Sequence, residues 1–469
     1  MSHQDSLIAE DIAGYLEAHE KKSLLRFITC GSVDDGKSTL IGRLLYDSKL
    51  IYEDQLASLE SDSKRMGTQG EQIDFALLVD GLAAEREQGI TIDVAYRYFS
   101  TDKRKFIVAD TPGHEQYTRN MATGASTADV AILMIDARKG ILTQTRRHSF
   151  IVSSLGIKNL VLAINKMDLV DYDQKVFDQI VKDYAEFAKG LGHDDLKIQP
   201  IPMSALEGIN VAASGGKVEW YDGPSLMEYL ETVPVGDWRP DAPFRMPVQW
   251  VNRPNLDFRG FAGQIVSGSI KPGDRIRALP SGREANVARI VTMDGDLDEA
   301  VPGQSVTITL DAEIDISRGD VISTALSPAE VSDQFQARIL WMSDTAMLPG
   351  RRYLLKIGAR TVSATVNAPK HGIDINDMSE IPAKTLELNE IGVCTLSLEQ
   401  PIAFDAYDDV QEMGAFILID RMSNDTVGMG LIDFALRRAS NIHWQSLDIT
   451  AATLAEQKGQ KPAVLWFTG

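Results

Sequence analysis

Five short stretches, in one order along the chain, carry residue types that together would hold a nucleoside triphosphate. Each stretch supplies a different part of what such a ligand needs, so their joint occurrence is more specific than any single match. They are Gly31-Ser32-Val33-Asp34-Asp35-Gly36-Lys37-Ser38 with Thr39, Gly89-Ile90-Thr91, Asp110-Thr111-Pro112-Gly113-His114, Asn165-Lys166-Met167-Asp168 and Ser204-Ala205-Leu206.

The first stretch has the surroundings of a phosphate-binding loop. It follows an apolar run over residues 24–30 and precedes a predicted helix over residues 39–45. Its two glycines permit turns that aim successive N–H groups at one anion, and the helix adds its positive N-terminal end. We expect Lys37 to reach the β- and γ-phosphates and the Ser38 hydroxyl to bind Mg²⁺.

The second and third stretches would complete the metal site and sense the γ-phosphate. Asp110 ends an apolar run and is expected to bind Mg²⁺ through water, because this ion keeps most of its waters. The N–H of Gly113 would contact the γ-phosphate. Thr91 would add its hydroxyl to Mg²⁺ only while the γ-phosphate is present, as in the order–disorder switch of GTPases. Residues 91–95 alone also fit an ordinary strand.

The last two stretches would read the base. Guanine presents two adjacent donors, N1–H and the exocyclic amine, and the Asp168 carboxylate can accept from both, whereas adenine lacks this pair. Asn165 would tie its loop to the phosphate loop, and the stem of Lys166 would lie over the base. The Ala205 N–H would meet guanine O6. The pattern therefore predicts GTP rather than ATP.

His114 is the candidate catalytic residue. Phosphoryl transfer to water needs an oriented nucleophile more than a strong base, and His114 directly follows the glycine assigned to the γ-phosphate. The other histidines are expected to be capped or solvated side chains: His3, His19, His148, His193, His371 and His443. No arginine finger is identifiable from the sequence.

Longer segments bear a family resemblance. Residues 75–93 (FALLVDGLAAEREQGITID) and 120–137 (NMATGASTADVAILMIDA) resemble the elongation-factor branch of translational GTPases. Within the phosphate loop, however, Ser32 and Asp35 stand where translation factors usually carry histidine. The loop, the stretch from Asp110 to Gly124 and NRPNLDFRGFAG at residues 252–263 together resemble the large subunit of sulfate adenylyltransferase, the GTPase subunit of bacterial ATP sulfurylase.

This resemblance implies a partner and a reaction. In that family a separate small subunit binds ATP and sulfate and makes adenosine 5′-phosphosulfate, and GTP hydrolysis on the large subunit drives the reaction. Beyond the guanine site, no second complete nucleotide motif is found; Ser214-Gly215-Gly216-Lys217 is interpreted as a polar surface turn. Two alternatives stay open: a translation factor that delivers an RNA, and a regulatory GTPase without a coupled reaction.

Composition fits a large enzyme. The chain has 469 residues, 44% of them hydrophobic, which suggests about three domains. No apolar run is long enough to span a bilayer, and acidic residues near the N-terminus do not fit a signal peptide. Two cysteines, Cys30 and Cys394, make no disulfide framework, so we expect a cytoplasmic protein. The net charge of −20 opposes nonspecific nucleic-acid binding.

The pattern along the chain predicts an α/β P-loop GTPase domain followed by two antiparallel β-barrel domains. The GTPase domain would have a mostly parallel sheet with helices on both faces. The polar hairpin at residues 252–260 is either a solvated loop or a contact surface for the switch or the partner. The expected division is an N-terminal helix at 1–20, the GTPase domain at 21–236, barrels at 240–328 and 329–435, and a tail at 436–469.

The two ends of the chain carry separate expectations. The N-terminal helix either packs on its own domain or docks to the small subunit. At the other end, residues 461–469 (KPAVLWFTG) resemble the junction to a fused adenylylsulfate kinase, although the phosphate loop of that kinase is missing. We expect the chain to be part of such a fusion, with a poorly packed tail.

Overall fold

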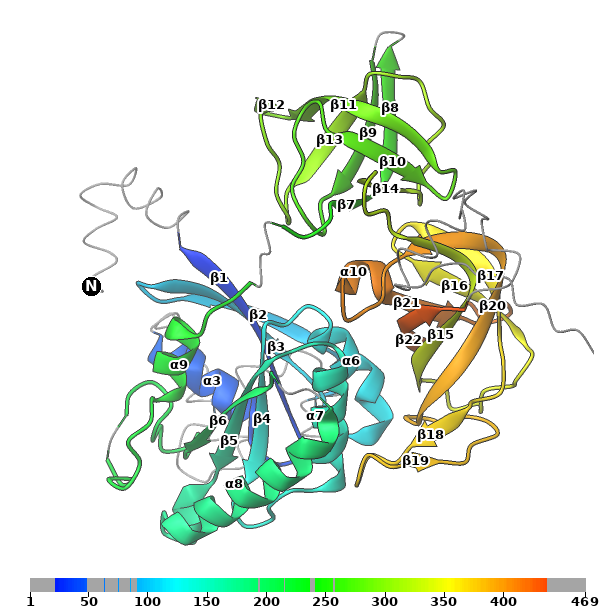
Figure 1. The fold of residues 1–469 in the computed structure, drawn as a ribbon. Coiled ribbons are helices and arrows are strands. Elements are labelled where there is room, and N and C mark those ends of the chain that lie inside the picture. The colour runs from blue at the N-terminus through cyan, green and yellow to red at the C-terminus, as the bar shows by residue number, and fades with distance from the viewer. Residues whose placement is uncertain are drawn as a thin grey trace, which may run out of the picture.

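The computed structural model describes residues 22–48, 63, 75, 85, 91–192, 195–214, 216–236, 241–255 and 258–436. Within them the chain forms an α/β domain (residues 22–236), domain 2 (strands β7 to β14) and domain 3 (strands β15 to β22), as Figure 1 shows. The predicted N-terminal helix, the tail beyond residue 436, and Gly89 and Ile90 lie outside the described residues. No helix in the described part of the chain has the length and apolar character needed to cross a membrane.

The α/β domain is built on a six-stranded sheet with the order β2-β3-β1-β4-β5-β6. The pairs β1–β3, β1–β4, β4–β5 and β5–β6 are parallel, and only the edge strand β2 runs antiparallel to its neighbour β3. The elements are β1 (Ser23–Gly31), α3 (Lys37–Asp47), β2 (Ala95–Ser100), β3 (Arg104–Asp110), η2 (Glu115–Tyr117), α6 (Thr118–Ala125), β4 (Val130–Asp136), α7 (Thr143–Ser154), β5 (Asn159–Asn165), η3 (Met167–Val170), α8 (Gln174–Ala188), η4 (Lys189–Leu191), β6 (Lys197–Pro202) and α9 (Leu226–Thr232).

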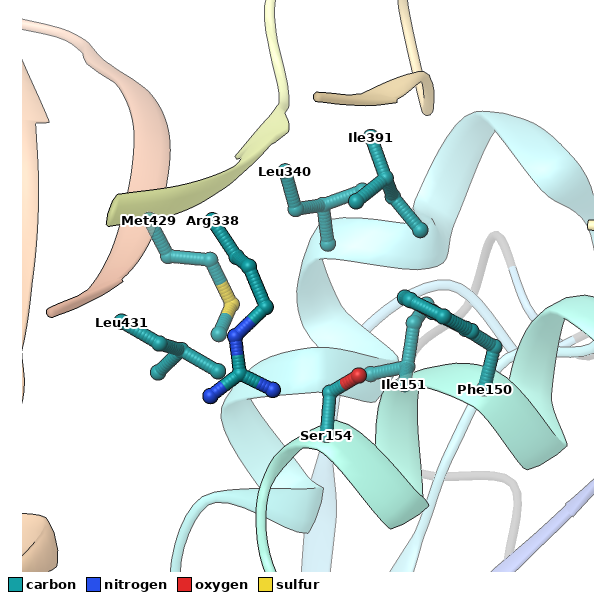
Figure 2. Close-up of a pocket in the computed structure, with 8 residues that line it drawn as sticks. All are labelled: Phe150, Ile151, Ser154, Arg338, Leu340, Ile391, Met429 and Leu431. Atoms are coloured by element: carbon teal, nitrogen blue, oxygen red, sulfur yellow. The ribbon is translucent and has the colours of Figure 1, made fainter. Parts of the chain in front are cut away.

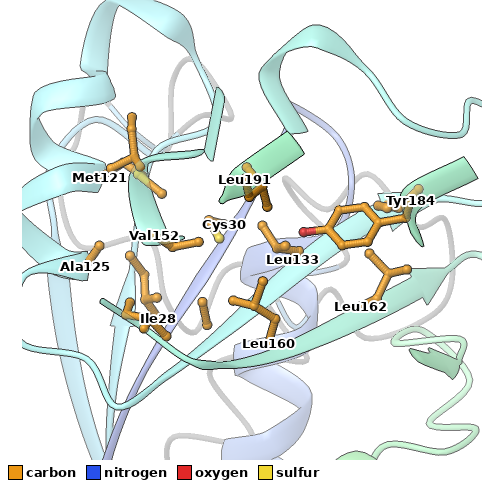
Figure 3. Packing of buried hydrophobic residues seen from close by; sticks show 14 of the residues in the cluster. Ile28, Cys30, Met121, Ala125, Leu133, Val152, Leu160, Leu162, Tyr184 and Leu191 are labelled. Carbon is orange, nitrogen blue, oxygen red and sulfur yellow. The ribbon is translucent and has the colours of Figure 1, made fainter. Parts of the chain in front are cut away.

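Helices cover both faces of this sheet, as the sequence predicts. All seven residues of β4 are buried, and successive ones enter two different cores: Leu133 packs with α6, α7 and α8, whereas Ile132 packs with α3 and α9. Figure 3 shows part of the first core, where Cys30 lies among aliphatic side chains. Burial raises the pKa of the Cys30 thiol to about 12, so it behaves as a small apolar group.

The segment before β2 does not form the ordinary strand that is the alternative interpretation of residues 91–95. Residues 91–95 fit a strand by pattern, yet β2 begins only at Ala95. The N–H groups of Ile92 and Asp93 donate to Glu85 Oε1 at 3.0 and 3.3 Å, and the carbonyl of Ile92 accepts from Asn120. Because side chains take these backbone groups, they cannot pair with β3.

Domain 2 is an antiparallel sheet with the order β7-β14-β10-β11-β13-β9-β8, and β12 pairs with β11. A bridge between Arg245 and Ser267 joins its first strand to the segment after β9, so the sheet curls around one apolar core. The hairpin predicted at residues 252–260 is formed by β8 and β9. The strands are β7 (Arg245–Pro247), β8 (Trp250–Asn255), β9 (Phe258–Gln264), β10 (Arg275–Leu279), β11 (Arg283–Thr292), β12 (Gly295–Leu297), β13 (Ser305–Leu310) and β14 (Val321–Thr324).

Domain 3 is a closed antiparallel barrel. The strand order is β15-β22-β21-β16-β17-β20, and β20 pairs back with β15 over most of its length, while β18 and β19 extend from β20. The elements are β15 (Glu330–Trp341), β16 (Arg352–Ile357), β17 (Arg360–Val366), β18 (His371–Ile373), β19 (Glu380–Ile381), β20 (Ile391–Phe404), α10 (Gln411–Gly414), β21 (Ala415–Ile419) and β22 (Thr426–Ala435).

Domain 3 contacts both other domains. Arg245 of domain 2 forms a largely buried ion pair with Asp405, with Nε and Oδ2 2.7 Å apart. On the other side, Leu340, Ile391 and Leu431 belong to the same apolar core as helices α6, α7 and α8 of the α/β domain. The barrel therefore shares a hydrophobic core with the α/β domain.

Candidate functional site

The predicted phosphate loop connects β1 to α3 and is shaped by its glycines. Gly36 has φ +95° and caps α3, and a Cβ there would lie 2.5 Å from Asn165 Nδ2. A larger residue would therefore meet both a strained backbone and a neighbouring side chain. The N-terminus of α3 faces the loop, which is the arrangement that binds phosphate.

Lys37 lies buried at the centre of this loop. Its ammonium donates to the carbonyls of Ser32 at 2.8 Å and Gly31 at 3.4 Å, so it is held against the loop backbone. Burial lowers the pKa of Lys37, and the nearby Asp35 and Asp110 carboxylates oppose that shift. A Cβ on Gly113 would lie 2.5 Å from Lys37 Nζ, so the third predicted stretch touches the first, and only glycine fits there.

Two of the three residues predicted to bind metal come together. Ser38 Oγ, in the first turn of α3, lies 3.4 Å from Asp110 Oδ2 at the end of β3. Hydroxyl and carboxylate oxygens are ligands that suit Mg²⁺. Thr91 is half-buried in the segment before β2, and its place relative to Ser38 and Asp110 stays a prediction.

Asp35 belongs to the predicted phosphate loop, where it departs from the elongation-factor pattern. In the structure its side chain is buried, and Oδ2 accepts the Ser32 N–H at 2.6 Å across the loop. Its carbonyl accepts from Asn165 Nδ2 at 2.8 Å. Burial raises the pKa of Asp35, whereas Lys37 and the Ser32 N–H lower it. Asp35 therefore braces the loop from inside.

Asn165 links three of the predicted stretches. Its Nδ2 donates to the phosphate loop, and its Oδ1 accepts the Ala205 N–H at 2.9 Å. The predicted tie between Asn165 and the phosphate loop is therefore present. In this structure the Ala205 N–H points to Asn165, so its donation to guanine O6 stays a prediction.

Lys166 and Asp168 follow at the tip of β5. Lys166 has φ +61°, and its ammonium donates to the carbonyl of Asp34 and lies 3.2 Å from Asp136 Oδ2. Burial alone would raise the pKa of Asp136, but hydrogen bonds from Arg138 and Lys166 outweigh it and the pKa is lowered. Lys166 is thus held against the phosphate loop, and Asp168 lies in the first turn of η3 beside it, while their contacts with the base stay predictions.

His114 caps the short helix η2 directly after Gly113. Its Nδ1 accepts the Gln116 N–H at 3.3 Å, so the proton of the neutral imidazole lies on Nε2. An imidazole in this tautomer orients a water molecule by hydrogen bonding rather than by removing its proton. That role is the one predicted for phosphoryl transfer.

For His148, the expectation of a capped or solvated histidine is wrong. The side chain is fully buried in α7, and its Nδ1 accepts the Gly31 N–H of the phosphate loop at 3.0 Å. A signal for it was present in the sequence, because His148 has helical spacing to the buried Ile151 and Val152. His371 is half-buried, with Nε2 3.5 Å from Glu380 Oε1, and the four remaining histidines lie outside the described residues.

The burial of His148 makes stability depend on pH. Burial, and then the neighbouring cations Lys37 and Arg147, lower its pKa from 6.5 to about 3. Below pH 6.5 the unfolded chain binds a proton that the folded chain excludes, so stability is lost as the pH falls. Between pH 7 and pH 5 the free energy of unfolding should drop by about 2 kcal/mol from this group. A His148→Asn variant keeps an acceptor near Nδ1 but cannot titrate. Urea unfolding at both pH values should show a smaller drop in the free energy of unfolding for the variant. Equal drops in the two proteins would show that His148 is not the source of the pH dependence.

Three family models match consecutive parts of the chain. The family models described as "Elongation factor Tu GTP binding domain", "Elongation factor Tu domain 2" and "GTP-eEF1A C-terminal domain-like" match residues 22–235, 262–323 and 334–433. The first match shows that the chain binds guanine nucleotides. Among solved structures, sup35 complexed with GMPPNP is 23% identical and covers 92% of this chain and 98% of its own, with a TM-score of 0.40.

Curated relatives are much closer in sequence. "Bifunctional enzyme CysN/CysC" of Xylella fastidiosa is 59% identical over 98% of this chain and 74% of its own length. "Bifunctional enzyme NodQ" of Rhizobium sp. is 59% identical over 98% and 71%. "Sulfate adenylyltransferase subunit 1" of Aeromonas salmonicida is 58% identical over 92% of this chain and 91% of its own. Identity at this level over nearly the whole of both chains shows that this protein belongs to the sulfate adenylyltransferase subunit 1 family.

Proposed function

We propose that this chain is the GTP-hydrolysing subunit of sulfate adenylyltransferase. In this proposal GTP hydrolysis drives the synthesis of adenosine 5′-phosphosulfate and pyrophosphate from ATP and sulfate on a partner small subunit. This is the first step of sulfate assimilation toward cysteine. The observation that carries the proposal is the 58% identity to a sulfate adenylyltransferase subunit 1 over 91% of that relative. Residues 21–236 form the GTPase domain, and residues 240–328 and 329–435 form the two barrels.

The loop between β1 and α3 binds the phosphates of GTP in this proposal. Its amides and Lys37 neutralise the β- and γ-phosphates, while Asn165 holds the loop against the base-reading stretches. Asp168 accepts the paired donors of guanine. Ser38 and Asp110 would hold Mg²⁺, because the oxygens of these two side chains meet at the N-terminus of α3. Thr91 would be a further ligand. The ion would neutralise charge on the phosphates when bound.

His114 orients the attacking water. It follows Gly113, which lies against Lys37, so the imidazole is next to the end of the site that takes the γ-phosphate. With Nδ1 accepting from Gln116, the Nε2–H is the group offered to the water or to a phosphate oxygen. Positioning and charge stabilisation are the main contributions that such a transfer requires.

The coupling to sulfate activation has a thermodynamic reason. A mixed phosphate–sulfate anhydride replaces an ordinary phosphoanhydride, so the adenylyl transfer is uphill and needs a second energy source. A chain that binds its partner differently in its GTP and GDP states supplies that energy through the difference in affinity. Two relatives are bifunctional, which supports a fused or associated adenylylsulfate kinase as a further partner. We place the protein in the cytoplasm, where its partners would act.

A translation factor is the alternative that the elongation-factor architecture suggests. It is not favoured, because the relatives at 56–59% identity that are named for a single activity are sulfate adenylyltransferase subunits. Ser32 and Asp35 also stand where translation factors usually carry histidine. Asp35 uses its carboxylate to close the loop on the Ser32 N–H.

One assay separates the candidate functions. GTP turnover is measured for the chain alone, with tRNA and ribosomes, and with the small subunit plus ATP and sulfate. We expect stimulation only in the last condition, accompanied by formation of adenosine 5′-phosphosulfate. Stimulation by ribosomes would support the translation factor instead, and turnover that no addition changes would support a regulatory GTPase.

A further inference from the structure

Domain 3 contacts the α/β domain at the C-terminal end of α7 and at η2, and Arg146 of α7 also donates to the carbonyl of Asn376 at 2.7 Å. The first is the C-terminal end of α7, where the Tyr407 hydroxyl and Gln411 Nε2 both donate to the carbonyl of Leu155, at 3.0 and 3.3 Å. Figure 2 shows the apolar contact next to it, with Phe150 and Ile151 of α7 facing Leu340 and Ile391 of the barrel. This first contact combines hydrogen bonds with apolar packing, because Leu340 and Ile391 share one buried core with Ile151 of α7.

The second contact is a single polar one. Asn389, in the turn before β20, donates from Nδ2 to the carbonyl of Glu115 at 2.8 Å, across 274 residues of sequence. Asn389 is 7% exposed, so the donor side of this hydrogen bond is buried, whereas Glu115 lies at the surface. Glu115 is the first residue of η2 and directly follows His114, the residue proposed to orient the attacking water.

The turn that carries Asn389 is rigidly attached to the barrel. The N–H of Asn389 donates to the carbonyl of Trp341 at 2.9 Å, and the N–H of Trp341 donates to the carbonyl of Glu390 at 2.9 Å. Asn389 itself has φ +65°, a left-handed conformation that asparagine tolerates better than most residues. The backbone of this turn is therefore bent so that one side-chain amide reaches out of the barrel toward η2.

The short helix η2 does not depend on the hydrogen bond from Asn389 for its own structure. The carbonyl of Glu115 also accepts from the Thr118 hydroxyl at 2.7 Å, within the same helical region. The Asn389 amide restrains the Glu115–Gln116 peptide from outside the α/β domain, and the N–H of that same peptide donates to His114 Nδ1. Because small displacements of a catalytic group lower rates steeply, such a restraint acts on hydrolysis more than on folding.

We infer that Asn389 is a positioning residue for GTP hydrolysis: it holds η2, and with it His114, in register with the bound nucleotide only while domain 3 is docked. The barrel thereby makes catalysis conditional on its own position. This inference rests on the proposed role of His114 and adds a residue outside the GTPase domain to that role.

The test uses the full chain with its small subunit, ATP and sulfate. Asn389→Gly suits it, because glycine adopts φ +65° without strain and only the amide is lost. Single-turnover GTP hydrolysis should fall about tenfold while the dissociation constant for GTP stays within about twofold. Asn389→Asp keeps the shape but turns an acceptor toward the Glu115 carbonyl, so it should be at least as slow. Asn424→Gly is the matched control, since Asn424 also has φ +63° but is exposed in domain 3.

A double-mutant cycle with His114→Ala decides whether Asn389 acts through His114. In that background Asn389→Gly should produce no further loss of rate. Equal losses in both backgrounds would overturn the inference, and so would a wild-type rate for Asn389→Gly, while the proposed function would stand. If His114→Ala itself hydrolysed GTP at the wild-type rate, both the inference and the proposed catalytic residue would fail.

Discussion

Replacing His114 with alanine is expected to lower GTP hydrolysis by about 10²-fold or more, with GTP binding retained. The reason is that the imidazole sits at the N-cap of η2, next to Gly113 and outside the loop that holds the phosphates. Removing it takes away the group that orients water but leaves Lys37, the loop amides and the base-reading residues in place.

The measurement is single-turnover hydrolysis of GTP alongside equilibrium binding of a non-hydrolysable analogue. His371→Ala is a matched control, because it removes a half-buried histidine from domain 3 whose ring nitrogen lies 3.5 Å from Glu380. We expect the control to hydrolyse GTP normally. Unchanged turnover in the His114 variant would remove this residue from the mechanism, and a parallel loss of binding would assign it to the nucleotide pocket instead.

Asp168→Asn is expected to weaken GTP binding by about two orders of magnitude and to favour xanthosine triphosphate. In the proposed site the carboxylate would accept two hydrogen bonds from guanine, and each charge-assisted bond of this kind contributes roughly 1.5–3 kcal/mol. The amide of asparagine can donate to the extra oxygen of xanthine, so the preference should invert rather than disappear. A site built to hydrogen-bond one base strongly rejects a base that leaves its polar groups unpaired.

Competition between the two triphosphates for the purified protein measures this change of preference. Asp171→Asn is the matched control, because Asp171 is exposed three residues further along with φ +53°, where asparagine is well tolerated. An unaltered preference in the Asp168 variant would show that the fourth stretch does not read the base. A loss of binding to both nucleotides would point to damage in η3.

Local chemistry was predictable where it depends on a few consecutive residues. The strand before the phosphate loop, the helix after it and the hairpin formed by β8 and β9 agree with the sequence pattern. Glycines with positive φ and alternating apolar residues leave a readable trace, because each constrains only its own neighbourhood. The predicted hydrogen bond between Asn165 and the phosphate loop is also present. The two stretches follow β1 and β5, which run parallel on either side of β4 and end at the same edge of the sheet.

A local sequence pattern misleads where distant residues compete for the same backbone groups. Residues 91–95 fit a strand, but Glu85 and Asn120 take their hydrogen bonds. His148 was expected to be capped or solvated, yet it accepts from Gly31, 117 residues away, inside a buried core. The helical spacing of His148 to Ile151 and Val152 indicates that it is buried, but nothing around it indicates Gly31 as its partner, because that contact forms only when α7 packs on the loop.

The amino-acid types and their order were enough to predict a guanine nucleotide as the ligand and to name the residues expected to bind it. Those residues must present fixed types at fixed spacings, because phosphate, metal and guanine each demand particular donors and acceptors. Only the tertiary structure decided how that site is held: Asp35 closing the loop from inside, His148 bracing it from α7, and Asn389 reaching η2 from the barrel. These contacts depend on where whole elements pack, and packing is the sum of many weak contacts spread over the entire chain.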